Sequence, residues 1–216
     1  MNRWLAHLLS RAFDGSLAPE RRDDLRRSGL TDETIAAEFI RSVPPGMIGP
    51  LLGFDMPAVR SALLFPFRSP AGGFMDHVRV KIFPPLIDAD GHTIKYLQPK
   101  GCAPRLYFPA FTLRDGLTDG RPLWCIEGEK KSLAVAQLGL PAVGFCGVEG
   151  WHVRGSCLLL PDFDNLLLRD RTVELVPDGD VRSNPNVALA VRRFAYALQG
   201  RGARPRLVVL PDEARR

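Results

Sequence analysis

The sequence has few cysteines and places them far apart. No two of them form a CxxC pair: the four are Cys102, Cys125, Cys146 and Cys157. This spacing argues against a zinc ribbon and against a disulfide framework. It favours a reducing, cytoplasmic environment.

Long hydrophobic runs are missing as well. No stretch approaches the roughly 18 apolar residues of a transmembrane helix, so we expect no membrane association. The opening MNRWLAHLLSRAF is too short and too interrupted by charge to be typical of a signal peptide. No GxxxxGK[ST] motif occurs, and EGEKKS lacks its first glycine, which argues against a P-loop helicase domain in these 216 residues.

What remains is the composition of an ordinary globular protein, with 45% hydrophobic and 25% charged residues. The length of 216 residues suits one large domain or two small ones. A net charge of +5 and a pI near 9.3 are compatible with a polyanionic partner. Arginine-rich composition alone gives the same balance, so this evidence is weak.

Local patterns predict three regions. Residues 1–60 form a helical N-terminal region, in which 19–41 are helical, with a stop at Gly29 and Thr31 as an N-cap. The Pro/Gly-rich segment 43–57 is predicted to be a connector. Residues 61–121 form a small β-rich region and a linker.

Within residues 61–111, short runs rich in β-branched and aromatic residues alternate with Gly, Pro and Asp. They predict a mostly antiparallel sheet that includes RLYFPA at 105–110. DADG at 88–91 is typical of a hairpin turn. The segment TLRDGLTDGRP at 112–122 is predicted to be a linker.

From residue 122 to 216, strand and helix patterns alternate. Strands are predicted over 123–126, 141–147, 171–177 and 206–211, with helices over 129–139 and 184–202. This alternation predicts an α/β domain with a parallel sheet and helices on its faces.

Acidic residues follow two of these strands. Glu127 comes at the end of the first, and Asp178 and Asp180 follow a later one. Ligands of open parallel sheets bind beyond the carboxyl ends of the strands. If the two strands are neighbours, three carboxylates meet there, and a cation among them relieves their repulsion. Oxygen ligands of this kind suit Mg²⁺.

Two lysines, Lys130 and Lys131, lie in the first turn of the following helix, where the helix dipole disfavours cations. We therefore expect them to face a phosphate. The alternative is that they are solvated and balance Glu127 and Glu129.

A second acidic pair, Asp162 and Asp164, also ends an apolar run. Too few residues follow it for a crossover helix before the next strand. We interpret these two residues as the N-terminal acids of a short helix.

Trp151 and His152 follow a glycine-rich turn near the expected crevice, and packing is a better explanation for them than nucleotide contact. The four histidines are scattered, and none is assigned to a metal.

The segment IEGEKKSLAVAQLGLPAVG, followed by RTVELVPDGD and an amphipathic helix, resembles a Toprim domain. This Rossmann-like module occurs in DnaG-type primases, topoisomerases and some nucleases. The resemblance implies that Glu127, Asp178 and Asp180 bind Mg²⁺ or Mn²⁺ and that Glu127 also acts as a general acid or base. With IKYLQPKGCAPRLYFP upstream, residues 20–211 are most similar to Toprim-like domains of phage, plasmid and integrative-element primase-helicase proteins.

The resemblance implies Mg²⁺-dependent phosphoryl or nucleotidyl transfer on DNA or nucleotides during replication of a mobile element. Primer synthesis is the favoured reaction, and nucleolytic cleavage is the alternative because it uses the same acids. The chain has neither the zinc-binding domain nor the helicase domain of related proteins. A separate helicase is therefore an expected partner.

The other alternative is a non-catalytic module that binds nucleic acid or a partner protein. Basic residues interleave with aromatic ones in HVRVKIF and in IKYLQPKGCAPRLYF, as they do in proteins that bind single strands. The candidate nucleic-acid-binding residues there are Lys95, Lys100 and Arg105. A two-faced sheet with aromatics in its core and cations in water gives the same pattern.

Overall fold

The computed structural model describes residues 17–209, except for the side chains of residues 115 and 180. It divides into two compact units. The first comprises residues 1–69 and 73–102, and the second comprises residues 70–72 and 103–216. The three-part division expected at residues 60 and 121 stays a prediction.

The described part of the first unit begins with two short helices, as expected. Helix α2 (Pro19–Arg26) ends before Gly29, whose φ is +80°, and α3 (Asp32–Ala37) follows. Thr31 is the N-cap of α3, because its side chain accepts a hydrogen bond from the N–H of Thr34 at 3.2 Å. The predicted helix is too long at its C-terminal end. Phe39 has a φ of 54°, outside the helical region, and the chain then enters strand β1 (Arg41–Val43).

The Pro/Gly-rich segment predicted to be a connector contains helix α4 (Pro45–Leu52), so that prediction was wrong. Pro45 occupies the first turn, where its missing N–H costs nothing. Gly53 ends the helix with a left-handed φ of 77°. Ile48, Leu51 and Leu52 are buried, and their packing outweighs the weak intrinsic helix propensity of this segment.

An antiparallel sheet forms the centre of the first unit. Its strand order is β1-β2-β3-β4, with β2 (Ser61–Arg68), β3 (Phe74–Ile87) and β4 (Thr93–Leu97). One face packs on α4 through a buried cluster that includes Leu64, Val78 and Val80. The predicted antiparallel region is confirmed for residues 61–97.

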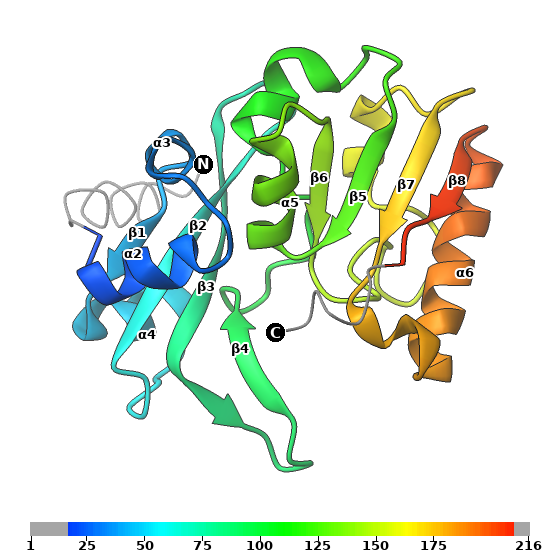
Figure 1. The fold of residues 1–216 in the computed structure, drawn as a ribbon. Helices are drawn as coiled ribbons and strands as arrows, with labels where there is room; N and C mark the ends of the chain where they lie inside the picture. Colours follow the sequence, from blue (N-terminus) through cyan, green and yellow to red (C-terminus); the bar gives the residue numbers. More distant parts are fainter. Residues whose placement is uncertain (1–16, 210–216) are drawn as a thin grey trace. The chain divides into compact units, whose positions relative to one another are not determined.

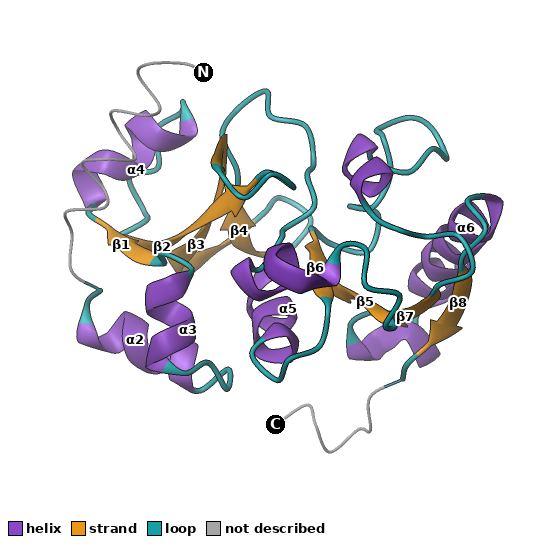
Figure 2. Ribbon diagram, turned by 90° about the horizontal axis from the view of Figure 1, so that it is seen from above, coloured by secondary structure: helices purple, strands orange, loops and turns teal. Residues whose placement is uncertain are grey.

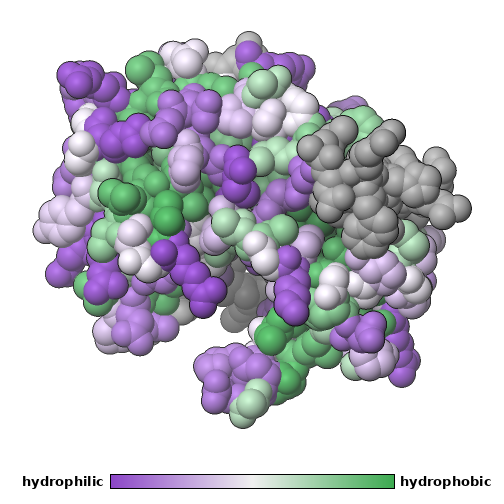
Figure 3. Space-filling view, turned by 180° about the vertical axis from the view of Figure 1, so that it is seen from behind, coloured by the Kyte–Doolittle hydropathy of each residue, from purple (hydrophilic) through white to green (hydrophobic). Residues whose placement is uncertain are grey.

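The end of the β3–β4 hairpin combines a hydrophobic stem with a hydrophilic tip (Figure 3). The register of β3 against β4 shifts between Lys81 and Leu86, where Pro84 and Pro85 cannot donate ladder hydrogen bonds. At the tip, Asp88 Oδ1 accepts hydrogen bonds from the N–H groups of Asp90 and His92. The hairpin turn predicted at DADG is thus confirmed.

A parallel sheet forms the centre of the second unit (Figure 1). Its order is β6-β5-β7-β8, with β5 (Leu123–Glu127), β6 (Ala142–Phe145), β7 (Thr172–Val176) and β8 (Arg204–Leu207). The fold class predicted from the strand and helix pattern, a parallel sheet flanked by helices after an antiparallel sheet, is confirmed.

Helices α5 (Glu129–Ala136) and α6 (Pro185–Gly200) cover opposite faces of this sheet (Figure 2). Alternate residues of β5 point to the two faces. Cys125 joins the larger core, which contains Phe194 of α6, and Ile126 joins a smaller cluster with Ala136 of α5. Short 3₁₀ helices occupy η2 (Pro161–Asn165) and η3 (Gly179–Arg182).

The segment RLYFPA does not belong to the antiparallel sheet, which corrects our expectation. Leu106 and Phe108 are buried in the core of the second unit. Tyr107 forms an isolated antiparallel bridge with Gly144 of β6, with two backbone hydrogen bonds of 2.8 Å. Apolar packing from residues far away in the sequence therefore decides where this short strand-like run pairs.

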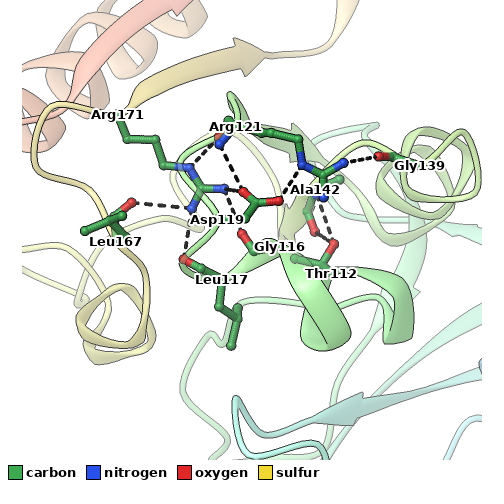
Figure 4. Close-up of polar contacts among 9 residues, drawn as sticks. All are labelled: Thr112, Gly116, Leu117, Asp119, Arg121, Gly139, Ala142, Leu167 and Arg171. Carbon is green, nitrogen blue, oxygen red and sulfur yellow. Dashed lines mark hydrogen bonds and ion pairs between the residues drawn. The ribbon is translucent and has the colours of Figure 1, made fainter.

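The predicted linker 112–122 is an ordered part of the second unit, which again corrects the expectation. It contains a π-helical turn, η1 (Thr112–Gly116), and is tied to the sheet by Arg171 (Figure 4). The guanidinium of Arg171 is fully buried and donates to a set of acceptors on this segment and nearby: the carbonyls of Gly116, Leu117, Arg121 and Leu167, and the carboxylate of Asp119.

Within residues 17–209, no helix has both the length and the hydrophobicity that a membrane crossing requires.

Candidate functional site

Two of the predicted acids meet at the carboxyl end of the parallel sheet. Glu127 is the last residue of β5, and Asp178 lies two residues beyond the end of β7. The two strands are direct parallel neighbours, with Ile126 opposite Val176. A carboxylate oxygen of Glu127, Oε2, accepts a hydrogen bond of 3.1 Å from the backbone N–H of Asp178. This hydrogen bond holds the loop after β7 against the end of β5.

The third predicted acid is Asp180, in the turn of η3. Its side chain lies outside the described part of the structure, so its place in the site stays a prediction. The backbone of this turn is anchored on Asp178, whose carbonyl accepts a hydrogen bond from the N–H of Val181 at 3.3 Å.

Lys131 brings a positive charge to the same place. It lies in the first turn of α5, and its ammonium Nζ forms an ion pair with Asp178 Oδ1. The Lys131 side chain is 44% exposed and the Asp178 side chain is 55% exposed, so solvent reaches this pair. Lys130 precedes it in the same turn and is half-buried. Their predicted contact with phosphate stays a prediction.

The backbone turn between β5 and α5 depends on Gly128. Its φ is +98°, a conformation that residues with a Cβ rarely adopt, as expected from its place after Glu127. The N–H of Gly128 donates to the carbonyl of Phe145 at 2.9 Å and the carbonyl of Gly128 accepts from the N–H of Ser132 at 3.2 Å. The turn is thus fixed to β6 on one side and to α5 on the other.

Glu129 is buried, which the sequence interpretation did not predict. The alternative interpretation had it balance solvated lysines, but only 1% of its surface is exposed. Its Oε1 lies 3.5 Å from the thiol sulfur of Cys146, which follows β6. Its position as the first residue of α5 gave no local signal that this side chain is buried.

Close packing around Glu129 leaves no room for larger residues. A Cβ on Gly144 would lie 2.8 Å from Ser132 Oγ and 3.1 Å from the Cβ of Tyr107. A Cβ on Gly150 would lie 2.2 Å from the carbonyl oxygen of Cys146. Gly144, which pairs with Ile126 of β5, and Gly150 therefore stand where a side chain would clash with its surroundings.

Arg105 forms an ion pair with the buried carboxylate of Asp162. Its guanidinium Nε lies 2.9 Å from Oδ2 of Asp162 and its NH2 lies 2.5 Å from Oδ1. Asp162 also accepts from the N–H of Leu106 at 2.9 Å and is 3% exposed. Asp162 and Asp164 lie in the first turn of η2, which confirms their interpretation as N-terminal acids of a short helix. The predicted nucleic-acid contact of Arg105 stays a prediction.

Lys95 and Lys100 are exposed residues of the first unit. Lys95 lies on β4, and the N–H of Lys100 donates to the carbonyl of Leu52 at 2.8 Å. Trp151 is 1% exposed and its ring stacks on Phe194 at 4.9 Å, so packing accounts for it as expected.

The residues at the sheet end fit a divalent metal in chemical terms. Glu127 and Asp178 offer carboxylate oxygens, the ligands that Mg²⁺ prefers, from two adjacent strand ends that solvent reaches. Mg²⁺ needs only one or two protein carboxylates when water and phosphate complete its coordination.

A separate group of metal-type ligands lies in the β3–β4 turn. Ligand atoms of Asp88, Asp90 and His92 lie within 4.8 Å of one another. The turn itself explains this cluster, because the N–H groups of Asp90 and His92 donate to Asp88 Oδ1. These hydrogen bonds, above all that from His92, hold the pKa of Asp88 below its usual value. It is not the site predicted at the end of the parallel sheet.

Comparisons with known proteins place this geometry in a wider context. A family model described as a domain of unknown function, DUF3854, matches residues 117–216. No curated protein matches the sequence. The match to the family model covers β5, α5, β7 and both described acids.

Solved structures are similar over nearly the whole chain. The DnaG catalytic core aligns with a TM-score of 0.63 and 19% identity, over 97% of this chain and 72% of that one. The zinc-binding and RNA polymerase domains of the Aquifex aeolicus primase align at 0.63 and 13% identity, over 96% of this chain and 55% of that one. The DnaG primase catalytic domain bound to single-stranded DNA aligns at 0.58 and 20% identity, over 97% and 74%. The chain therefore has the fold of primase catalytic cores, as its resemblance to Toprim proteins implied.

Proposed function

We propose that this protein is a primase-like enzyme that transfers nucleotides by Mg²⁺-dependent chemistry on a nucleic-acid template. One observation carries the proposal: Glu127 and Asp178 come from adjacent strand ends and are joined by a hydrogen bond of 3.1 Å. They lie in a fold that is similar to DnaG catalytic cores. Similarity to a DnaG domain bound to single-stranded DNA supports nucleic acid as the substrate class.

Each residue has a distinct role in this proposal. Asp178 and Asp180 would hold Mg²⁺ or Mn²⁺ with Glu127, and the ion, when bound, would neutralise charge on the transferring phosphoryl group. Glu127 would accept or donate a proton at its carboxylate oxygens. Lys130 and Lys131 would bind phosphate oxygens from the first turn of α5.

We also propose a biological setting, which the sequence resemblance implies. The protein would act in the replication of a phage, plasmid or other mobile element. A separate helicase, which the similarity to primase-helicase proteins suggests, would open the duplex.

Two assays run side by side test the proposal. Ribonucleotide incorporation on a single-stranded template with Mg²⁺ or Mn²⁺ should be measurable for the wild type and lost in Glu127→Gln. Cleavage of plasmid and of single-stranded DNA, measured with the same proteins, reports the nuclease alternative, which uses the same acids. Incorporation that is unchanged in Glu127→Gln would contradict the catalytic role of this residue.

A second candidate function, single-strand binding without catalysis, is favoured by one feature of the first unit. The rings of Phe39 and Phe74 are 40% and 39% exposed and meet edge to face at 5.3 Å. The guanidinium of Arg68 lies 4.3 Å from the Phe74 ring centre. Exposed aromatic rings beside a guanidinium are suited to stacking on bases. Strand binding that persists in EDTA, weakens in Phe74→Ala and occurs without turnover would support this candidate.

A further inference from the structure

The cation beside the acidic site is supplied by the chain itself. Lys131 lies in the first turn of α5, where the helix dipole disfavours a positive charge. Its ion pair with Asp178 offsets this cost, because the pair brings opposite charges together across the end of the sheet. Gly128 lies beside the Lys131 stem and carries no side chain, and a Cβ there would lie 3.5 Å from the Cε of Lys131.

The two carboxylates of the site are held differently. Glu127 is fixed by the hydrogen bond that it accepts from the Asp178 backbone. The Asp178 side chain instead pairs with a lysine that is itself 44% exposed. Exposed ion pairs of this kind are weak, and the four-carbon stem of lysine lets its ammonium move to a new partner at little cost. The pair with Lys131 is therefore the exchangeable contact of this site.

We propose that Lys131 is an internal counter-ion of the acidic site, which a divalent metal displaces from Asp178 and which then binds the phosphate of the incoming nucleotide. The proposal rests on the proposed function, and it adds a competition that the function does not require. A ligand that needs Asp178 must break its contact with Lys131, so the lysine weakens metal binding. Once the metal is bound, the released ammonium strengthens phosphate binding.

Because of this competition, one substitution should change two affinities in opposite directions. Lys131→Gln removes the competing cation, so Mn²⁺ should bind about three- to ten-fold more tightly. The metal then has no ion pair with Asp178 to break and no positive charge of Lys131 beside it. The same variant lacks an ammonium for phosphate. It should therefore bind the Mn²⁺ complex of inorganic triphosphate at least about three-fold more weakly.

Isothermal titration calorimetry of the full chain measures both affinities. Mn²⁺ is titrated first, and the preformed Mn²⁺–triphosphate complex is then titrated into Mn²⁺-loaded protein. Arg193→Gln is the matched control, because it makes the same change in charge at an exposed position of α6 in the same unit. Its Mn²⁺ affinity should stay within about two-fold of the wild type. Lys131→Arg keeps the charge and should restore wild-type Mn²⁺ affinity to within about two-fold.

The outcomes separate this proposal from the proposed function. If wild type and Lys131→Gln both fail to bind Mn²⁺, the metal function is overturned, and the counter-ion role falls with it. If the wild type binds Mn²⁺ and Lys131→Gln binds it equally or more weakly, only the counter-ion role is overturned. Tighter Mn²⁺ binding with unchanged triphosphate binding would overturn the phosphate step alone.

Discussion

The carboxylate of Glu127 accepts a hydrogen bond of 3.1 Å from the backbone N–H of Asp178, which lies 51 residues further along the chain. The contact exists because β5 and β7 are parallel neighbours, so their carboxyl ends share one edge of the sheet. It gives Glu127 a structural task beside its proposed chemical one. Substitutions at this residue should therefore separate the two tasks.

Replacement of Glu127 by glutamine keeps a carbonyl oxygen that can accept from Asp178 but removes the negative charge. The free energy of unfolding should change by less than about 1 kcal/mol, since the hydrogen bond can persist. Ribonucleotide incorporation should fall by about 100-fold or more if the residue moves a proton. Chemical denaturation and primer-synthesis assays check the two parts, with the exposed Glu149→Gln as a control that should retain activity.

Arg171 holds the ordered segment 112–122 against the sheet. Its guanidinium is fully buried, and burial lowers its pKa from the usual value while Asp119 opposes that shift. Arg171→Met leaves the carboxylate of Asp119 and several carbonyls without their donor. We expect the free energy of unfolding to fall by about 3–5 kcal/mol.

Urea denaturation of Arg171→Met and of Arg192→Met measures this loss. Arg192 is exposed on α6, so its substitution should change the free energy of unfolding by no more than about 0.5 kcal/mol. Equal stability of the two variants would show that segment 112–122 is not held by Arg171.

Among the glycines of residues 17–209, Gly150 should be the least replaceable. The Cβ of an alanine there would lie 2.2 Å from the backbone carbonyl oxygen of Cys146, and no side-chain rotation relieves a clash with backbone. Gly150→Ala should destabilise the protein by about 2 kcal/mol or more. Gly73→Ala is the control, because nothing lies within 4 Å of its Cβ position and its φ is not positive. Thermal unfolding of both variants tests the difference.

Much of the second unit could be predicted from sequence because its signals are local. Alternating strand and helix patterns predicted the parallel sheet. The acids at two strand ends predicted that Glu127 and Asp178 lie close together. The two acids could meet only if β5 and β7 were neighbours, which the structure shows.

The errors came from contacts between residues far apart in sequence. The partner of Arg105 is Asp162, 57 residues away, and no local pattern links them. Segment 112–122, which contains two Asp-Gly pairs, was predicted to be a linker, yet Arg171 orders it from 50 or more residues away. Helix α4 was missed because Pro and Gly suggest a loop, although Pro45 and Gly53 stand where helices begin and end.

The buried Cys125 should differ in reactivity from the exposed Cys157. Burial raises the pKa of the Cys125 thiol from 9.0 to about 12, so it holds almost no thiolate at pH 8. Iodoacetamide at pH 8 should label Cys157 in the native protein and Cys125 only after denaturation, as mass spectrometry of the peptides will show. Native labelling of Cys125 at a rate similar to that of Cys157 would contradict its burial.

The same shift gives a dependence of stability on pH. The folded state keeps the Cys125 proton up to about pH 12, whereas the unfolded thiol loses it near pH 9. The unfolded state therefore binds fewer protons in this window, and the contribution of Cys125 to stability is complete below pH 9 and lost as pH rises toward 12. The denaturation midpoint should be lower at pH 10 than at pH 8. The difference between the two midpoints should be smaller in Cys125→Ala.

The central claim is tested most directly by Mn²⁺ binding measured with electron paramagnetic resonance. The signal of free Mn²⁺ decreases as the ion binds to the protein. The wild type should bind Mn²⁺, and Glu127→Gln and Asp178→Asn should each bind it at least about ten-fold more weakly, because each loses a carboxylate ligand. A wild type that leaves the free-ion signal unchanged, or variants that bind Mn²⁺ as tightly as the wild type, would contradict a metal site formed by Glu127 and Asp178.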